Sequence, residues 1–100
     1  MEEVQDILQP STLDSLKLIN AIKNLISSNI YNDAISAENI MLVWYSKTIQ
    51  NAKMLLYPLG TNDYFEVTLN GDKQEVYIDR YTKTQKWIVP IAHSEQNTEE

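Results

Sequence analysis

Apolar residues recur at steps of three and four between residues 13 and 26, which predicts an amphipathic helix. Pro10 and Ser11 precede this stripe, and Asp14 adds a carboxylate to the first turn, where the helix dipole favours negative charge. We expect the helix to run from about 12 to 29, since the polar residues 27–29 compete for its backbone hydrogen bonds. The predicted buried stripe consists of Leu13, Leu16, Ile19, Ala21, Ile22, Leu25 and Ile26, with Leu18 at its edge.

After residue 39 the pattern changes from helical to extended. Residues 40–45 form an apolar run rich in β-branched and aromatic types, which predicts a first strand over about 40–48. A second apolar run at 54–57 is stopped by Pro58 and predicts a second strand. A short helix across 47–57 is the alternative that this pattern leaves open.

Asn70 and Gly71 predict a hairpin, because Asn-Gly supplies the positive φ angles of a type I′ turn. On the strand before it, Phe65, Val67 and Leu69 share one face. A loop with an even number of residues puts Val76 and Ile78 on that face, whereas a three-residue loop would bury a lysine and a glutamate there. Since unpaired buried charges are costly, we expect an even loop.

A last apolar run, Trp87 to Ile91, predicts a final short strand. The fold class is therefore α+β, with an N-terminal amphipathic helix packed on a four- to five-stranded antiparallel meander. No repeat or Gly/Ser linker divides the 100 residues, so we expect a single domain over 1–100. Segments of about 1–9 and 92–100 are expected to be flexible acidic tails.

Charge and composition exclude several classes of protein. The formal charge of −6 comes from six tail carboxylates, and residues 7–92 carry equal numbers of acids and bases. Without cysteine the chain has no disulfide, thiolate zinc site or cysteine nucleophile, and the single His93 excludes a multi-histidine metal site. No apolar run approaches the ~20 residues that cross a bilayer, so we expect no membrane association.

No set of residues forms a convincing catalytic site. Ser46 and Lys47 are adjacent on the predicted first strand, so their side chains point to opposite faces and cannot form a dyad. Glu66 and Glu75 share a hairpin face and suggest an oxygen-ligand metal site, but a solvated polar face explains them more simply. We therefore expect a non-enzymatic protein with no metal and no cofactor.

Aromatic residues interleaved with lysines raise single-stranded nucleic-acid binding as an alternative, because bases stack on aromatic rings. The candidates are Trp44 or Tyr45 beside Lys47 and Lys53, together with tyrosines on the outer face of the second hairpin, Tyr64, Tyr77 and Tyr81. That outer face also carries acids, Glu66, Glu75 and Asp79, which oppose a phosphate backbone. A nucleic-acid mimic or a small-molecule sponge that acts against host defence is a further alternative.

Two blocks of sequence resemble a known family. Residues 44–53 are WYSKTIQNAK and residues 64–81 are YFEVTLNGDKQEVYIDRY. Together they are similar to small uncharacterised proteins of phages and prophages of Gram-positive bacteria, which are classified as a domain of unknown function. The resemblance covers roughly 38–91 and implies a phage-encoded accessory protein that acts in the bacterial cytosol. It implies no catalytic or binding residues.

A polar segment at the tip of the first hairpin is the predicted binding surface, because it is rich in hydrogen-bond donors. We expect it to contact a host or phage protein that this chain binds and modulates, and the sequence also leaves a homo-oligomer open. The predicted binding residues are Trp44, Ser46, Lys47, Thr48, Gln50, Asn51 and Lys53.

Overall fold

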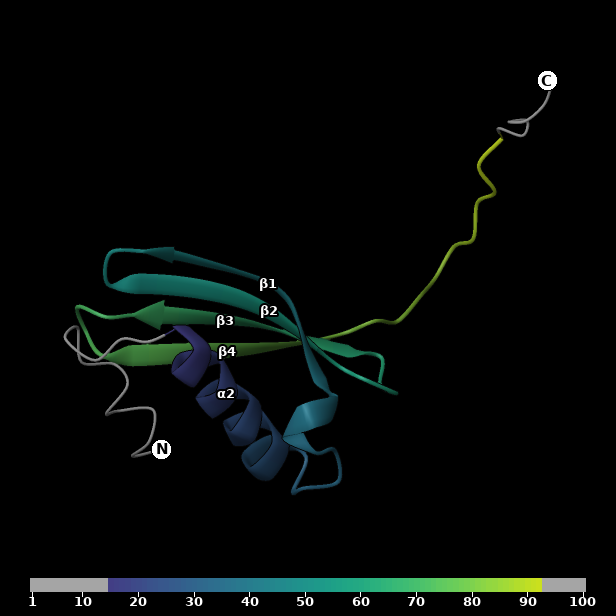
Figure 1. Ribbon diagram of the computed structural model, residues 1–100. Helices are drawn as coiled ribbons and strands as arrows, with labels where there is room; N and C mark the ends of the chain where they lie inside the picture. Colours follow the sequence, from purple (N-terminus) through teal and green to yellow (C-terminus); the bar gives the residue numbers. More distant parts are fainter. Residues whose placement is uncertain (1–14, 93–100) are drawn as a thin grey trace.

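One helix packs on a four-stranded antiparallel sheet, which confirms the α+β class (Figure 1). The computed structural model describes residues 15–92. The helix α2 (Ser15–Leu25) continues as a π-helical turn, η2 (Ile26–Ile30), and a short 3₁₀ turn, η3 (Ala37–Asn39), leads into the sheet. The sheet is a meander in the order β1-β2-β3-β4, formed by β1 (Ile40–Thr48), β2 (Asn51–Pro58), β3 (Asp63–Asn70) and β4 (Glu75–Thr82).

The buried face of α2 is centred on Leu18 and Ile22, both of which are completely inaccessible to solvent. The prediction that Leu16 is buried is wrong, since 68% of this side chain is exposed. Leu16 precedes Leu18 by two residues, or roughly 200° around the helix, and therefore faces solvent. The predicted helix start at Pro10 and Ser11 lies outside the described residues.

Strand pairing decides two questions that the sequence left open, namely whether residues 47–57 are helical and whether the sheet has four or five strands. β2 is hydrogen-bonded to β1 on one side and to β3 on the other, so the alternative helix across 47–57 is wrong. β1 has the predicted bounds of 40–48. The predicted fifth strand at Trp87 to Ile91 is also wrong, because residues 83–92 have no regular secondary structure.

The second hairpin has an even loop, as expected, but a longer one than a type I′ turn. Residues 71–74 form the turn between β3 and β4, and Val76 and Ile78 lie opposite Leu69 and Val67. Within this turn the positive φ angle of 54° belongs to Gln74 rather than to Asn70 or Gly71. A Cβ atom on Gly71 would lie 2.0 Å from the carbonyl oxygen of Gln50. Gly71 is therefore required where this turn meets the β1-β2 turn, and the type I′ prediction is wrong.

A β-bulge in β1 changes which side chains face the helix. The register shifts between Leu42 and Trp44, so that Val43 is an extra residue in the ladder. Beyond the bulge, Trp44 lies opposite Leu55 and Tyr45 opposite the buried Met54. Trp44 is thereby directed to the sheet face away from α2, because one extra residue inverts the alternation of the strand.

The core fills the layer between helix and sheet. Its strand contribution comes from alternate residues of the two central strands and from Ile40 of β1, and its helix contribution from the buried face of α2 and η2. No helix within residues 15–92 has the length and apolar character needed to span a bilayer. The completely or nearly completely buried strand residues are Ile40, Ala52, Met54, Leu56, Phe65, Val67 and Leu69.

Candidate protein-binding face

The sheet face turned away from α2 is covered by no other element among residues 15–92, and we call it the open face. Because alternate strand residues fill the core, the intervening ones form this face. Six of its large side chains each expose between 37% and 45% of their surface. These six residues are Met41, Trp44, Tyr57, Tyr64, Tyr77 and Tyr81.

One end of the open face is aromatic. The rings of Tyr64 and Tyr81 lie opposite each other on β3 and β4 and stack at a centroid distance of 5.0 Å and an interplanar angle of 9°. Tyr57 continues the aromatic surface on β2, and Trp44 lies opposite Leu55 in the next cross-strand row, which runs on to Glu66. We call Trp44, Leu55, Tyr57, Tyr64 and Tyr81 the aromatic end. Paired rings on adjacent strands support one another, so this surface is preorganised for contact.

The middle of the open face carries an ion pair and an excess of negative charge. Lys53 Nζ lies 2.8 Å from Glu66 Oε2, and this hydrogen bond raises the pKa of Lys53 and lowers that of Glu66. Asp79 lies directly opposite Glu66, where two like charges repel. The negative charge of Glu66 also raises the pKa of Tyr81. With Glu75, the face holds three carboxylates and one lysine, a formal charge of −2.

The other end of the open face is a polar hollow of about 360 Å³, near the two hairpin turns. Its walls come from all four strands, and they offer hydroxyl, amide and ammonium groups rather than carboxylates. The hollow is shallow and open to solvent, so it is suited to the side chains of a partner rather than to an enclosed small molecule. Its lining residues are Ser46, Thr48, Asn51, Ala52, Lys53, Thr68, Leu69, Asn70 and Tyr77.

The structure brings together most of the binding residues that the sequence suggested. Four of them line the hollow, namely Ser46, Thr48, Asn51 and Lys53, and Trp44 lies at the aromatic end. Lys47 lies opposite the buried Ala52 and so starts from the helix side of the sheet, whereas Gln50 is in the turn. These two residues are therefore separated from the hollow.

The predicted binding surface did not include the part of the hollow that β3 and β4 supply, which consists of Thr68, Leu69, Asn70 and Tyr77. Of these, the sequence had indicated only Tyr77, as a residue on which bases could stack. Lys53 is opposite Thr68, and Thr68 is opposite Tyr77, so one row crosses three strands. The even hairpin loop places Thr68 and Tyr77 on one face, but the loop length itself is needed to set them opposite each other. The sequence thus indicated only that the loop has an even number of residues. This determines which face of the sheet each residue occupies, but not which residues lie opposite each other.

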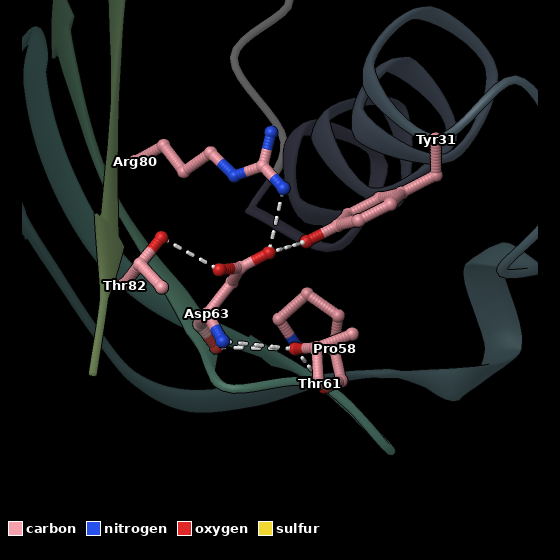
Figure 2. Close-up of polar contacts among 6 residues, drawn as sticks. All are labelled: Tyr31, Pro58, Thr61, Asp63, Arg80 and Thr82. Carbon is pink, nitrogen blue, oxygen red and sulfur yellow. Dashed lines mark hydrogen bonds and ion pairs between the residues drawn. The ribbon is translucent and has the colours of Figure 1, made fainter. Parts of the chain in front are cut away.

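A second polar cluster lies on the helix side of the sheet (Figure 2). Asp63 is only 7% exposed, and its Oδ2 accepts hydrogen bonds from the Tyr31 hydroxyl at 2.6 Å and the Arg80 guanidinium at 2.7 Å. Thr82 donates to Oδ1 at 2.8 Å. The hydrogen bond from Tyr31, followed by those from Arg80 and Thr82, lowers the pKa of Asp63 to about 2.

This cluster ties the segment after η2 to strands β3 and β4. A carboxylate with a pKa of about 2 stays ionised near neutral pH, where it has no proton to donate and is only a weak base. The guanidinium of Arg80 also lies 5.3 Å from the centroid of the Tyr31 ring, which holds the segment after η2 against the sheet. Within residues 15–92 no three His, Cys, Asp or Glu side chains group closely enough to hold a metal ion.

Comparison with known proteins matches the chain to a protein family. A family model described as a family of unknown function, DUF6275, matches residues 15–91, which include α2 and all four strands. No curated protein and no solved structure matches the chain significantly. The match therefore covers the helix and the sheet that the structure describes, and the description of the family assigns no activity.

Proposed function

Because the chain belongs to the DUF6275 family of unknown function, we propose a function from its own surface, that of a non-enzymatic domain that binds another protein through the open face. The supporting observation is the aromatic end, where Trp44, Tyr64 and Tyr81 are each about 40% exposed on a rigid sheet. Aromatic residues are enriched at protein interfaces, where they bury a large area at little cost in conformational entropy.

The polar hollow complements the aromatic end in this proposal. Protein interfaces combine an apolar centre with a polar rim that forms about one hydrogen bond per 100–200 Å². The open face has this composition, since Trp44 and Leu55 adjoin the row that begins with Ser46 and Lys53. A partner segment that lies along the strands would contact the aromatic end and the hollow together.

The proposed partner is a host or phage protein in the bacterial cytosol, which the chain binds and modulates. This context rests on the sequence resemblance to small phage and prophage proteins, a group that commonly redirects or blocks other proteins. The open face supports this proposal because it offers an exposed aromatic and polar surface to which another protein could bind. The chain would then act as a phage-encoded accessory protein through occupancy alone.

Affinity capture tests the proposal. The full-length tagged chain is expressed in bacterial cells, and proteins recovered with it are compared with those recovered by a face variant, Trp44→Ser with Tyr81→Ser. Leu16→Ser is the matched control, because this exposed leucine lies on α2 and away from the open face. We expect a partner to be recovered with the native chain and the control and to be lost with the face variant. Equal recovery with the face variant refutes the proposal.

Single-stranded nucleic-acid binding is the second candidate, and the stacked pair of Tyr64 and Tyr81 is the observation that favours it. Against it, Lys53 is engaged by Glu66, and the formal charge of −2 on the face opposes a phosphate backbone. This candidate requires a shift of labelled single strands that weakens with salt and with Trp44→Ala or Lys53→Ala. The absence of any shift at low salt would eliminate it.

A further inference from the structure

Residues 83–92, which we call the arm, follow β4 and extend away from the sheet (Figure 1). Trp87, Ile88, Val89 and Ile91 expose between 78% and 81% of their surface. The backbone hydrogen bond that joins the arm to the rest of the domain comes from Lys83 N to the Asn62 carbonyl oxygen, at 2.7 Å. Four large apolar side chains in water within five residues mark a segment that is suited to binding another surface.

We propose that the arm of one copy lies along the open face of a second copy, and that two copies exchange their arms in a symmetric dimer. This inference rests on the proposed function, because it uses the same protein-binding face; the occupant that it assigns to that face is a second copy of this chain, beside the host or phage protein proposed above. The interface would be isologous, with each copy contributing one arm and one face.

Shape and polarity agree between the two surfaces. In an extended segment alternate side chains point the same way, so that Trp87, Val89 and Ile91 form one apolar edge of the arm. The aromatic end offers Trp44 and Tyr64 as large, partly exposed partners for such an edge. Contact between the two removes apolar surface from water on both copies, which is the main favourable term in association.

Charge complementarity supports a second copy as the occupant. The arm carries Lys83 and Lys86 and no acid, a formal charge of +2, whereas the open face has a formal charge of −2. On the face, Asp79 lies opposite Glu66, whose carboxylate already pairs with Lys53. A lysine from an incoming arm would relieve the repulsion between these two carboxylates.

The length and origin of the arm also fit the exchange. Residues 83–91 span about 30 Å when extended, at about 3.3 Å per residue, and the eight-residue strands span about 26 Å. The arm begins after Thr82, next to Tyr81 at the aromatic end. A two-fold axis near this end of the sheet would therefore place the arm of each copy beside the aromatic end of the other.

Molar mass in solution tests the exchange with the full-length chain. Light scattering coupled to gel filtration should give twice the 11.6 kDa chain mass for the native protein and for Leu16→Ser. Either the arm variant, Trp87→Asp with Val89→Asp, or the face variant, Trp44→Ser with Tyr81→Ser, should weaken the dimer at least tenfold. Circular dichroism confirms that each variant is folded, and the arm variant alters only side chains that are about 79% exposed.

Mixing the variants distinguishes arm exchange from any other dimer. The arm variant keeps an intact face and the face variant an intact arm, so a mixed pair retains one of the two arm–face contacts. An equimolar mixture should therefore associate more strongly than either variant associates with itself. Asp79→Lys should weaken the native dimer, and Lys83→Glu with Lys86→Glu should restore the affinity when added to Asp79→Lys. Restoration by charge exchange would show that the two surfaces touch.

Several results would overturn the inference. A native chain that is monomeric at 100 µM or more, a dimer that survives the arm variant, or a mixture that associates no more strongly than either variant alone each rules out the exchange. The capture experiment separates this failure from failure of the proposed function. If the native chain is monomeric but its partner is still lost with the face variant, arm exchange alone is wrong. If capture is indifferent to the face variant, the proposed function is wrong.

Discussion

Replacement of Asp63 by asparagine should destabilise the domain in a way that depends on pH. The side chain is buried, and its carboxylate accepts hydrogen bonds from Tyr31, Arg80 and Thr82 (Figure 2). Asparagine has nearly the same shape and retains one oxygen, which can still accept from Tyr31 and Arg80, but its amide nitrogen cannot accept the hydrogen bond from Thr82. The substitution Asp63→Asn therefore removes the negative charge and one of the two acceptor atoms.

The magnitude follows from the pKa of Asp63. It falls from 3.8 to about 2 in the folded protein, and each pKa unit corresponds to about 1.4 kcal/mol. The folded state therefore gains about 2 kcal/mol from the ionised carboxylate relative to the protonated one. Since the folded pKa is depressed, this stabilisation is complete well above pH 4, declines as the pH falls through 3.8, and is lost as the pH falls through about 2. For a small domain with a typical stability of 5–15 kcal/mol, this is a substantial fraction.

Urea denaturation followed by far-ultraviolet circular dichroism measures the effect at several pH values between 7 and 2. We expect Asp63→Asn to lower the free energy of unfolding by about 2 kcal/mol at pH 7 and by progressively less below pH 4. Asp72→Asn, at an exposed position in the β3-β4 turn, is the control and should change it little. Equal stability of Asp63→Asn and the native protein at pH 7, or a deficit that is constant down to pH 2, would refute the reasoning.

Three further substitutions test other features of the fold. Tyr31→Phe removes the donor that lies 2.6 Å from Asp63, so we expect a loss of about 1–2 kcal/mol in urea and a rise in the pKa of Asp63, measured by NMR titration. Gly71→Ala places a methyl group 2.0 Å from the carbonyl oxygen of Gln50 and should cost about 1–3 kcal/mol, whereas native stability would show that the turns separate freely. Ile49 is 84% exposed with a φ of 52°, so Ile49→Asn should raise the midpoint of thermal unfolding by relieving about 1 kcal/mol of strain; an unchanged or lower midpoint contradicts this.

Local periodicity predicted most of the architecture. The bounds of β1 agree with the change from a helical to an extended pattern at Ile40. The even hairpin loop followed from the cost of burying Lys73 and Glu75, and the structure places Val76 and Ile78 toward the core as this argument requires. Such predictions succeed because each depends on the spacing of residues within one or two neighbouring segments.

The candidate site was predictable only in part. The hairpin tip contributes Ser46, Thr48 and Asn51 to the hollow, in agreement with the polar segment that the sequence indicated. Thr68 and Tyr77 come from the other hairpin, and their place beside Lys53 depends on the register between the strands, which the sequence did not determine. The cluster around Asp63 likewise joins segments up to 32 residues apart in sequence, and no local spacing reveals it.

The sequence by itself determined the α+β class, one amphipathic helix and the order of its strands, because apolar periodicity and turn residues act over short distances. Only the tertiary structure decided which surface the aromatic residues occupy. The bulge at Val43 sends Trp44 to the open face, where strict alternation from Ile40 would have placed it in the core. The tertiary structure also decided that Trp87 to Ile91 lie outside the sheet, because an apolar run becomes a strand only where a neighbouring strand pairs with it.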